Sequence, residues 1–582
     1  MLGKSGISVC LLLFLGASSL AEETSSQRPN VLFISIDDLN DWTGCLKGHP
    51  QTLTPNLDRL AASGVLFTNA HAPGASCNPS RTAVFTGRSP HRSGLYDSRQ
   101  KMRDVLPDAE LLPKTFSRHG YHSAGSGKLL HYVIDADSWN DYFPEAKSEN
   151  PFPRTMYPKN RPVSLSRKGD WQYVESDWAA LDVSDEAYGG DFLVARWISE
   201  QLKQQHEKPF FLACGFYRPH EPWFVPKKYF EPFPLESIQL PPGYREDDLA
   251  DLPPEGQRRG PNRYFAHIQE ENQWKQGIQG YLASIYFADT MLGHVLDALE
   301  NGPNAKNTIV VLWSDHGWHL GEKQHWQKYT AWRACTRVPL IVRVPKNSPG
   351  LPSGTSPGTS DAPVNLLSLF PTLLDLCGLP AESHHDGPSL TPLLSNPGGH
   401  WPHPSVTYLG EPKSFGLSTK RWRYIHYSQG GEELYDIETD PFEWENLAAD
   451  EKYQVKLAEM RGLAPKSFVE KKLVEKGPEP NLTWNVATRG NAPASTPSGP
   501  TFQIEFFNNS TQPIKLFVLD NRGQPSFAAI IHGGRKHLEK TQKGIVWQVT
   551  DGSGYQRGYF RAGNGPAKAI IPPTASAPQP RR

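Results

Sequence analysis

Three continuous apolar runs, each ending in polar residues, constrain the fold of this chain more than any other feature. The runs are 30–38 (NVLFISIDD), 208–216 (KPFFLACGF) and 307–317 (NTIVVLWSDHG). Because their apolar residues are continuous rather than alternating, they are typical of strands buried on both faces of a parallel sheet. Apolar residues at helical spacing lie between them, in 54–64 and 281–300. The sequence therefore predicts an α/β domain with a largely parallel sheet.

Polar side chains stand where each run ends. They are Asp37 and Asp38, then Arg218 and His220, and finally Asp315 and His316. Ligands of open α/β sheets bind beyond the carboxyl ends of the strands, so we expect these groups to converge at one edge. Adjacent carboxylates are unfavourable unless a cation neutralises them, and three of them fit a hard divalent ion, calcium before magnesium. A solvated loop would explain the Asp-Asp pair alone, but Asp315 at the same edge favours a metal site.

The stretch CNPSRTAVFTGR, residues 77–88, combines a cysteine with proline, arginine and glycine. If a helix begins near Pro79, the spacing of four residues can bring the Arg81 guanidinium back beside the sulfur of Cys77. A cysteine beside a fixed cation at a helix N-terminus is typical of sites that handle anions. The alternative is a buried structural cysteine near a surface arginine.

The N-terminus has the pattern of a secretory signal peptide over residues 1–21. Lys4 gives a basic start, 9–15 is apolar, and 19–21 (SLA) resembles a cleavage site. The apolar run is too short to span a bilayer. We therefore expect a secreted or periplasmic protein without a membrane span.

In the mature chain the number of cysteines is odd, so at least one thiol is unpaired or has another use. The cysteines are Cys45, Cys77, Cys214, Cys335 and Cys377. Cys214 and Cys377 lie in apolar runs and are expected to be buried.

A chain of 582 residues is expected to form several domains. Its 60 basic and 61 acidic residues nearly cancel, so nothing in the global charge indicates a nucleic-acid partner. Changes in pattern along the chain predict an α/β domain at 28–398, a small α+β subdomain at 399–466, a linker at 467–500, an all-β domain at 501–573 and a tail at 574–582.

The stretch 77–88 resembles the signature of the formylglycine-dependent sulfatases, in which the cysteine is oxidised to an aldehyde. Other motifs of that family follow in order: the Asp37-Asp38 strand end, GKLLH (127–131), FYRPH (216–220), SDHG (314–317), EKQHWQKY (322–329) and LYDIETDPFEWENLA (434–448). The resemblance covers about 28–466 and is closest to the iduronate-2-sulfatase branch.

This resemblance implies an alkaline-phosphatase-like fold and hydrolysis of the sulfate ester of a sulfated sugar or polysaccharide. It also implies a maturase that generates formylglycine from Cys77. A hydrated aldehyde offers two geminal hydroxyls: one attacks sulfur, and the second then loses its proton to expel sulfate. A serine could not perform the second step.

The resemblance also implies roles for particular residues. One calcium ion would be held by Asp37, Asp38, modified Cys77, Asp315 and His316. Arg81 would steady the aldehyde hydrate, while Lys128 and Lys328 would neutralise sulfate oxygens. His131 would accept a proton beside the nucleophile, and His220 would protonate the leaving alcohol.

Residues 501–573 resemble the β-domain of the von Hippel–Lindau protein in IEFFNNST, LDNRGQP, HGGRKHLEKT and GIVWQVTDGSG. Ile545 stands where a histidine lining the peptide pocket is expected, so the resemblance carries the fold and not the function. A contact with a protein or a glycan is the expected role of this domain.

Two alternatives for the whole chain stay open: a phosphodiesterase or phosphonate hydrolase of the same fold, and a non-catalytic glycan-binding protein. The sequence does not settle which sugar is bound.

Overall fold

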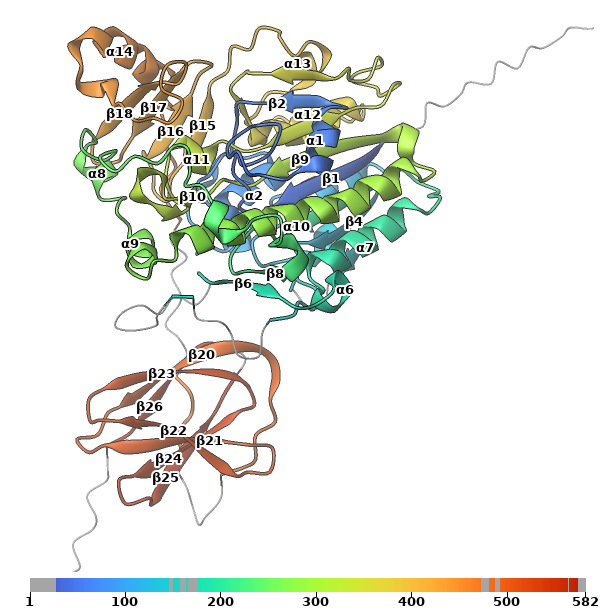
Figure 1. The fold of residues 1–582 in the computed structure, drawn as a ribbon. Helices are drawn as coiled ribbons and strands as arrows, with labels where there is room; N and C mark the ends of the chain where they lie inside the picture. Colours follow the sequence, from blue (N-terminus) through green and yellow to red (C-terminus); the bar gives the residue numbers. More distant parts are fainter. Residues whose placement is uncertain are drawn as a thin grey trace, which may run out of the picture. The chain divides into compact units, whose positions relative to one another are not determined.

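The structure, a computed structural model, describes residues 28–145, 150–157, 164–165, 176–472, 481–486, 492–563 and 565–573. The expected signal peptide (1–21) and tail (574–582) lie outside these residues. The chain divides into two units, residues 1–473 and 474–582, which are shown in Figure 1. Within the described part of the chain, no helix combines the length and the apolar character needed to cross a membrane.

A mixed eight-stranded sheet forms the centre of the first unit. Its strands, in spatial order, are β13 (Gly358–Ser360), β2 (Val65–Phe67), β12 (Leu340–Arg343), β9 (Thr308–Ser314), β1 (Asn30–Ile36), β7 (Phe210–Phe216), β4 (His122–Gly127) and β5 (Asp141–Phe143). The three apolar runs are the adjacent strands β9, β1 and β7, which pair in parallel. Only β12 runs antiparallel to its neighbours. The predicted α/β class is therefore confirmed.

Helices cover both faces of this sheet because successive residues of the buried strands point to opposite sides. Leu32 and Ile34 of β1 belong to one apolar core, and Val31 and Phe33 belong to the other. The first core is completed by α1 (Pro55–Ala61), α7 (Asp191–Leu202) and α10 (Trp274–Glu300). The second is completed by α2 (Cys77–Thr86), α5 (Leu112–Arg118) and α12 (Leu369–Leu376). Figure 1 shows the long helix α10 lying along the sheet.

Helix α10 starts seven residues earlier than the expected start at residue 281. Gly277 and Gly280 lie in the added turns, and glycine weakens a helical pattern in sequence. Both glycines are required by packing, since a Cβ at Gly280 would lie 2.8 Å from Trp178, and one at Gly277 2.9 Å from Trp326. Tertiary contact therefore extends the helix.

Short elements complete the first unit. The remaining helices are α3 (Pro90–Ser93), α4 (Met102–Val105), α6 (Asp185–Tyr188), α8 (Pro254–Gln257), α9 (Arg263–Glu270), α11 (Arg333–Thr336) and α13 (Thr391–Ser395). Two-stranded pairs are β3 (Ala70–His71) with β14 (Val364–Asn365), β6 (Trp178–Leu181) with β8 (Trp223–Pro226), and β10 (His319–Leu320) with β11 (Trp326–Gln327).

The predicted α+β subdomain is an antiparallel sheet followed by a helix. It consists of β15 (Ser405–Tyr408), β16 (Phe415–Ser418), β17 (Trp422–His426), β18 (Glu432–Asp436) and α14 (Gln454–Leu463). The chain then continues along the first unit, where the Val469 N–H donates to the His91 carbonyl (2.8 Å) and the Lys472 N–H to that of Gly94 (3.2 Å). The first part of the expected linker 467–500 is thus part of this unit.

The second unit is all β, as predicted. One sheet contains β19 (Asn485–Val486), β25 (Gln556–Arg561), β24 (Val546–Asp551), β21 (Ile514–Leu519) and β22 (Pro525–Ile531), and the other contains β23 (Lys536–Lys543), β20 (Ser498–Asn508) and β26 (Ala567–Ile571). Strand β19 falls inside the expected linker, where the adjacent Trp484 packs on Phe560 with ring centroids 5.0 Å apart. The start of β20 also falls there, because Ser498 pairs with Lys543 of β23. The likeness to the von Hippel–Lindau domain stays a prediction.

Candidate active site

The polar groups that follow β1, β7 and β9 lie together at one edge of the sheet, as the sequence predicts. The Asp38 N–H donates to Asp315 Oδ1 (3.1 Å), and His220 Nε2 lies 3.7 Å from Asp38 Oδ2. His316 Nε2 lies 3.4 Å from Asp38 Oδ1 and 3.5 Å from Asp315 Oδ2. Helix α10 supports this edge, since the Tyr281 hydroxyl donates to the Asp38 carbonyl (2.7 Å).

Cys77 is fully buried at the first position of α2. The helix begins at Cys77 itself, two residues before the expected start near Pro79. The Cys77 Sγ lies 3.1 Å from Lys328 Nζ, 3.2 Å from His316 Nε2 and 3.7 Å from Lys128 Nζ. Burial opposes ionisation of the thiol, but these cations hold the pKa of Cys77 well below its usual value. The surroundings of the Cys77 sulfur therefore favour a negatively charged group at this position.

Arg81 is also fully buried; its charge interacts with that of Cys77, but its hydrogen bonds within the described residues go to oxygen acceptors rather than to the sulfur. Its Nε donates to Asp315 Oδ2 (2.8 Å), its Nη2 to Asp37 Oδ1 (3.1 Å) and its Nη1 to the Lys128 carbonyl (2.6 Å). Two buried carboxylates are stronger partners for a guanidinium than a thiol. Although burial disfavours its charge, these carboxylates raise the pKa of Arg81 above its usual value.

Besides His316, the sulfur position has Lys128, Lys328, His131 and His220 near it. Lys128, directly after β4, pairs with Asp37, and Lys328 Nζ lies 2.9 Å from Asp38 Oδ1. Both lysines are buried. Burial lowers the pKa of His131. For His220, burial acts in the same direction, but the Asp38 carboxylate outweighs it and raises the pKa.

The carboxylate donors fit a divalent cation. Ligand atoms of Asp37, Cys77, Asp315 and His316 all lie within 4.8 Å of one another, as do those of Asp37, Asp38, Cys77 and His220. Asp38 Oδ2 is buried and has no hydrogen-bond partner among the described residues. Oxygen donors suit a hard cation such as calcium, whereas imidazole is a poor calcium ligand. Burial opposes the charged form of His316, but Asp315 and Cys77 raise its pKa to about 9.

Tyr217 is a residue of the site that sequence patterns did not identify. Its ring stacks on that of His220, with centroids 4.7 Å apart, and Lys128 Nζ lies 5.1 Å from its centroid. Its position in FYRPH, one residue before the polar cluster, was the available signal. The residue type alone gave no signal of a functional role, because a tyrosine after a buried strand is most often part of the core.

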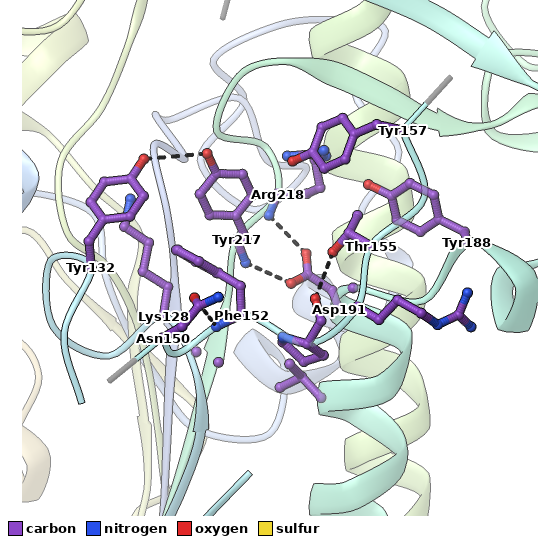
Figure 2. Close-up of a pocket in the computed structure, with 16 residues that line it drawn as sticks. Lys128, Tyr132, Asn150, Phe152, Thr155, Tyr157, Tyr188, Asp191, Tyr217 and Arg218 are labelled. Atoms are coloured by element: carbon purple, nitrogen blue, oxygen red, sulfur yellow. Dashed lines mark hydrogen bonds between the residues drawn. The ribbon is translucent and has the colours of Figure 1, made fainter. Parts of the chain in front are cut away.

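Two cavities flank these groups. One, of about 440 Å³, is lined by residues that include Lys128, Tyr132, Phe152, Tyr157, Tyr188, Asp191, Tyr217 and Arg218, and Figure 2 shows it. The other, of about 560 Å³, is lined by residues that include Asn78, Arg99, Lys101, Arg103 and His131. Residues next to the buried anion position thus line both cavities: Lys128 lines the first, and Asn78 and His131 line the second.

Comparison with known proteins agrees with this geometry. The family model described as Sulfatase matches residues 29–379, and that described as N-sulphoglucosamine sulphohydrolase, C-terminal, matches 321–463. A sulfatase of Formosa agariphila is 39% identical over 516 residues, which cover 87% of this chain and 95% of the relative. The iduronate 2-sulfatase of Mus musculus is 33% identical, with 65% and 75% covered. A solved phosphonate monoester hydrolase of Agrobacterium radiobacter shares the fold at 23% identity (TM-score 0.56; 77% and 100% covered).

Proposed function

The chain belongs to the sulfatase family of sulfuric ester hydrolases, with its alkaline-phosphatase-like fold, and we propose that it cleaves sulfate esters of a sulfated sugar through a formylglycine made from Cys77. One observation carries the proposal. The Cys77 sulfur is fully buried within 3.7 Å of two lysines and His316, next to a cluster of carboxylates. The relatives named iduronate 2-sulfatase support a sulfated glycan as substrate.

The modified residue would supply a hydrated aldehyde whose two hydroxyls permit attack on sulfur and later release of sulfate. Lys128 and Lys328 flank the sulfur position and would neutralise the sulfate oxygens as their charge develops. Both ammonium groups are already fixed by ion pairs with Asp37 and Asp38. They therefore need little reorganisation when substrate binds.

His131 and His220 would move protons at opposite stages of the reaction. The lowered pKa of His131 leaves its imidazole neutral and able to accept a proton. The raised pKa of His220, set by Asp38 against burial, favours a protonated ring that can donate to the leaving alcohol. Its Nδ1 is 2.7 Å from the Glu221 carbonyl, which orients Nε2 toward Asp38.

A single calcium ion would be held by Asp37, Asp38, Asp315 and the modified Cys77; His316 would be a further ligand only with a neutral imidazole, so the ion would have to displace its proton. Such an ion would supply positive charge to the nucleophile and to the sulfate group. Arg81 would hold the Asp37 and Asp315 carboxylates in place for it, since it donates to both.

Further parts of the proposal concern the protein's surroundings. Residues 1–21 would direct export, so that the mature enzyme works outside the cytoplasm, after a maturase has converted Cys77. The unit 474–582 would bring the enzyme to its polymeric substrate or to another protein. The mass and N-terminal sequence of the mature protein would test both the cleavage and the oxidation.

A phosphodiesterase or phosphonate hydrolase activity is the second candidate, because a phosphonate monoester hydrolase shares the fold and phosphate esters resemble sulfate esters in shape. The ratio of sulfatase to phosphatase activity on matched aryl esters separates the two. We expect the sulfate ester to be preferred.

The first experiment is sulfate release by matured protein, with Cys77→Ala as the blank. The substrates are a 2-O-sulfated uronate disaccharide and sulfated oligosaccharides without uronate. Release from any of them supports the proposal and excludes a non-catalytic glycan-binding protein. Absence of release from all of them, by protein whose oxidation at Cys77 is verified, would refute it.

A further inference from the structure

Arg218 carries a buried guanidinium that is only partly satisfied. The side chain is 1% exposed, and its Nη1 donates to the His220 carbonyl (2.9 Å). Its Nε and Nη2 atoms are buried and make no hydrogen bond of normal geometry within the described part of the chain, although the Tyr188 hydroxyl lies near the guanidinium. The nearby Asp191 carboxylate accepts instead from the backbone N–H groups of Tyr217 and Arg218, both at 2.8 Å.

A buried charge with unpaired donors is unfavourable, so such a group in a folded protein calls for a partner. The two free atoms are significant because Nε and Nη2 form one edge of the guanidinium. Two parallel N–H groups on that edge match two oxygens of a carboxylate or a sulfate. The chemistry of the free edge therefore selects an oxyanion.

Arg218 and Lys128 both line the cavity of about 440 Å³, so an oxyanion bound in it would lie against both side chains. Lys128 Nζ and Arg218 Cζ each lie 5.1 Å from the Tyr217 ring centroid, so they are at most about 10 Å apart. Figure 2 shows them on either side of that ring. The other rings of the wall, Tyr132, Phe152, Tyr157 and Tyr188, suit the apolar faces of a sugar.

We propose that Arg218 binds a second anionic group of the substrate, a carboxylate or a sulfate, on the same sugar whose sulfate ester is cleaved beside Cys77. This inference rests on the proposed function and makes Arg218 a determinant of specificity. The preferred substrate is then a sugar with two anionic substituents, such as a sulfated uronide or a doubly sulfated sugar.

The test compares sugars that differ only in the second group. The substrates are a 2-O-sulfated uronide, the same compound with its carboxyl reduced to an alcohol, and a doubly sulfated hexosamine. The reduced compound keeps the leaving alcohol, so any disturbance of His220 by a change at Arg218 affects it equally. We expect the parental enzyme to prefer at least one of the two dianionic sugars over the reduced compound by at least about 30-fold in kcat/KM.

Arg218→Gln and Arg218→Lys should remove most of this preference, because neither side chain offers the two-donor edge. Arg196→Gln is the matched control, since that arginine is on the protein surface and pairs only weakly with Glu186 (3.5 Å); it should keep the preference. The sugar that loses its advantage in the Arg218 variants identifies the anion as a carboxylate or a sulfate. If the preference is absent, or persists in both variants, the inference is wrong.

A measurement on the parental enzyme covers the case in which the variants do not fold. Free uronic acid should inhibit hydrolysis of an aryl sulfate at least about tenfold more strongly than the corresponding neutral sugar, or a doubly sulfated sugar should do so relative to a singly sulfated one. Equal inhibition within each pair would overturn the inference. If no sulfate ester is hydrolysed at all, the proposed function fails instead.

Discussion

Replacement of Arg81 by methionine tests the charge arrangement that organises the site. Arg81 is fully buried and donates to Asp315, Asp37, Ser35 and the carbonyls of Lys128 and Leu129. Methionine fills a similar volume without charge, so the change removes these interactions with little loss of packing.

The expected loss of stability follows from the carboxylates left behind. Removal of one partner from a buried ion pair costs about 3–5 kcal/mol, because the remaining charge is uncompensated. Here Lys128 still pairs with Asp37, and His316 lies 3.5 Å from Asp315. We therefore expect the lower end, about 3 kcal/mol less free energy of unfolding for the first unit.

The assay is urea unfolding followed by tryptophan fluorescence in EDTA, because a bound divalent ion would itself compensate the carboxylates. Arg196→Met is the control: its side chain is 49% exposed, and its loss should cost less than about 1 kcal/mol. If Arg81→Met destabilises the protein no more than Arg196→Met does, Arg81 does not carry the charge balance described above.

Four further predictions follow from the same structure. Cys77→Ser should fold normally but lose turnover by about a thousandfold or more, because serine lacks the second hydroxyl; near-parental sulfate release would refute the formylglycine mechanism. Chelation should abolish sulfate release and calcium should restore it better than magnesium, whereas full activity after exhaustive chelation would exclude a required metal. Burial raises the pKa of Asp289, which accepts from the Leu57 N–H, to about 6. The contribution of protonated Asp289 to the free energy of unfolding should thus be lost as pH rises from about 4 to about 6. Urea unfolding across this range should show a smaller decline of that free energy for Asp289→Asn than for the parent, and equal declines would contradict this. Deletion of 474–582 should reduce turnover of a sulfated polymer but not of a small sulfate ester, and unchanged polymer turnover would argue against a recruiting role for that unit.

Local sequence patterns were sufficient to identify the central strands and the edge at which the site lies. Strands β1, β7 and β9 are buried on both faces, so each had to be apolar throughout, and the first polar residue after each run marked its end. The same reasoning failed for the start of α10, where Gly277 and Gly280 obscure the helical pattern because each lies against a tryptophan. It was also incomplete for 467–500, which was expected to be a linker because of its polar composition. Val469 and Lys472 are hydrogen-bonded to the first unit, and β19 and the start of β20 belong to the second.

The sequence by itself identified the family and the residues expected at its site, because the spacing of Cys77 and Arg81 and the polar ends of three strands carry the family's motifs. Only the tertiary structure decided how those groups are paired. The Arg81 guanidinium donates hydrogen bonds to Asp37 and Asp315, since buried carboxylates are its strongest available partners. Likewise, the end of the 208–216 run placed Arg218 at the edge of the site, but its burial and its unpaired edge depend on the tertiary packing around it.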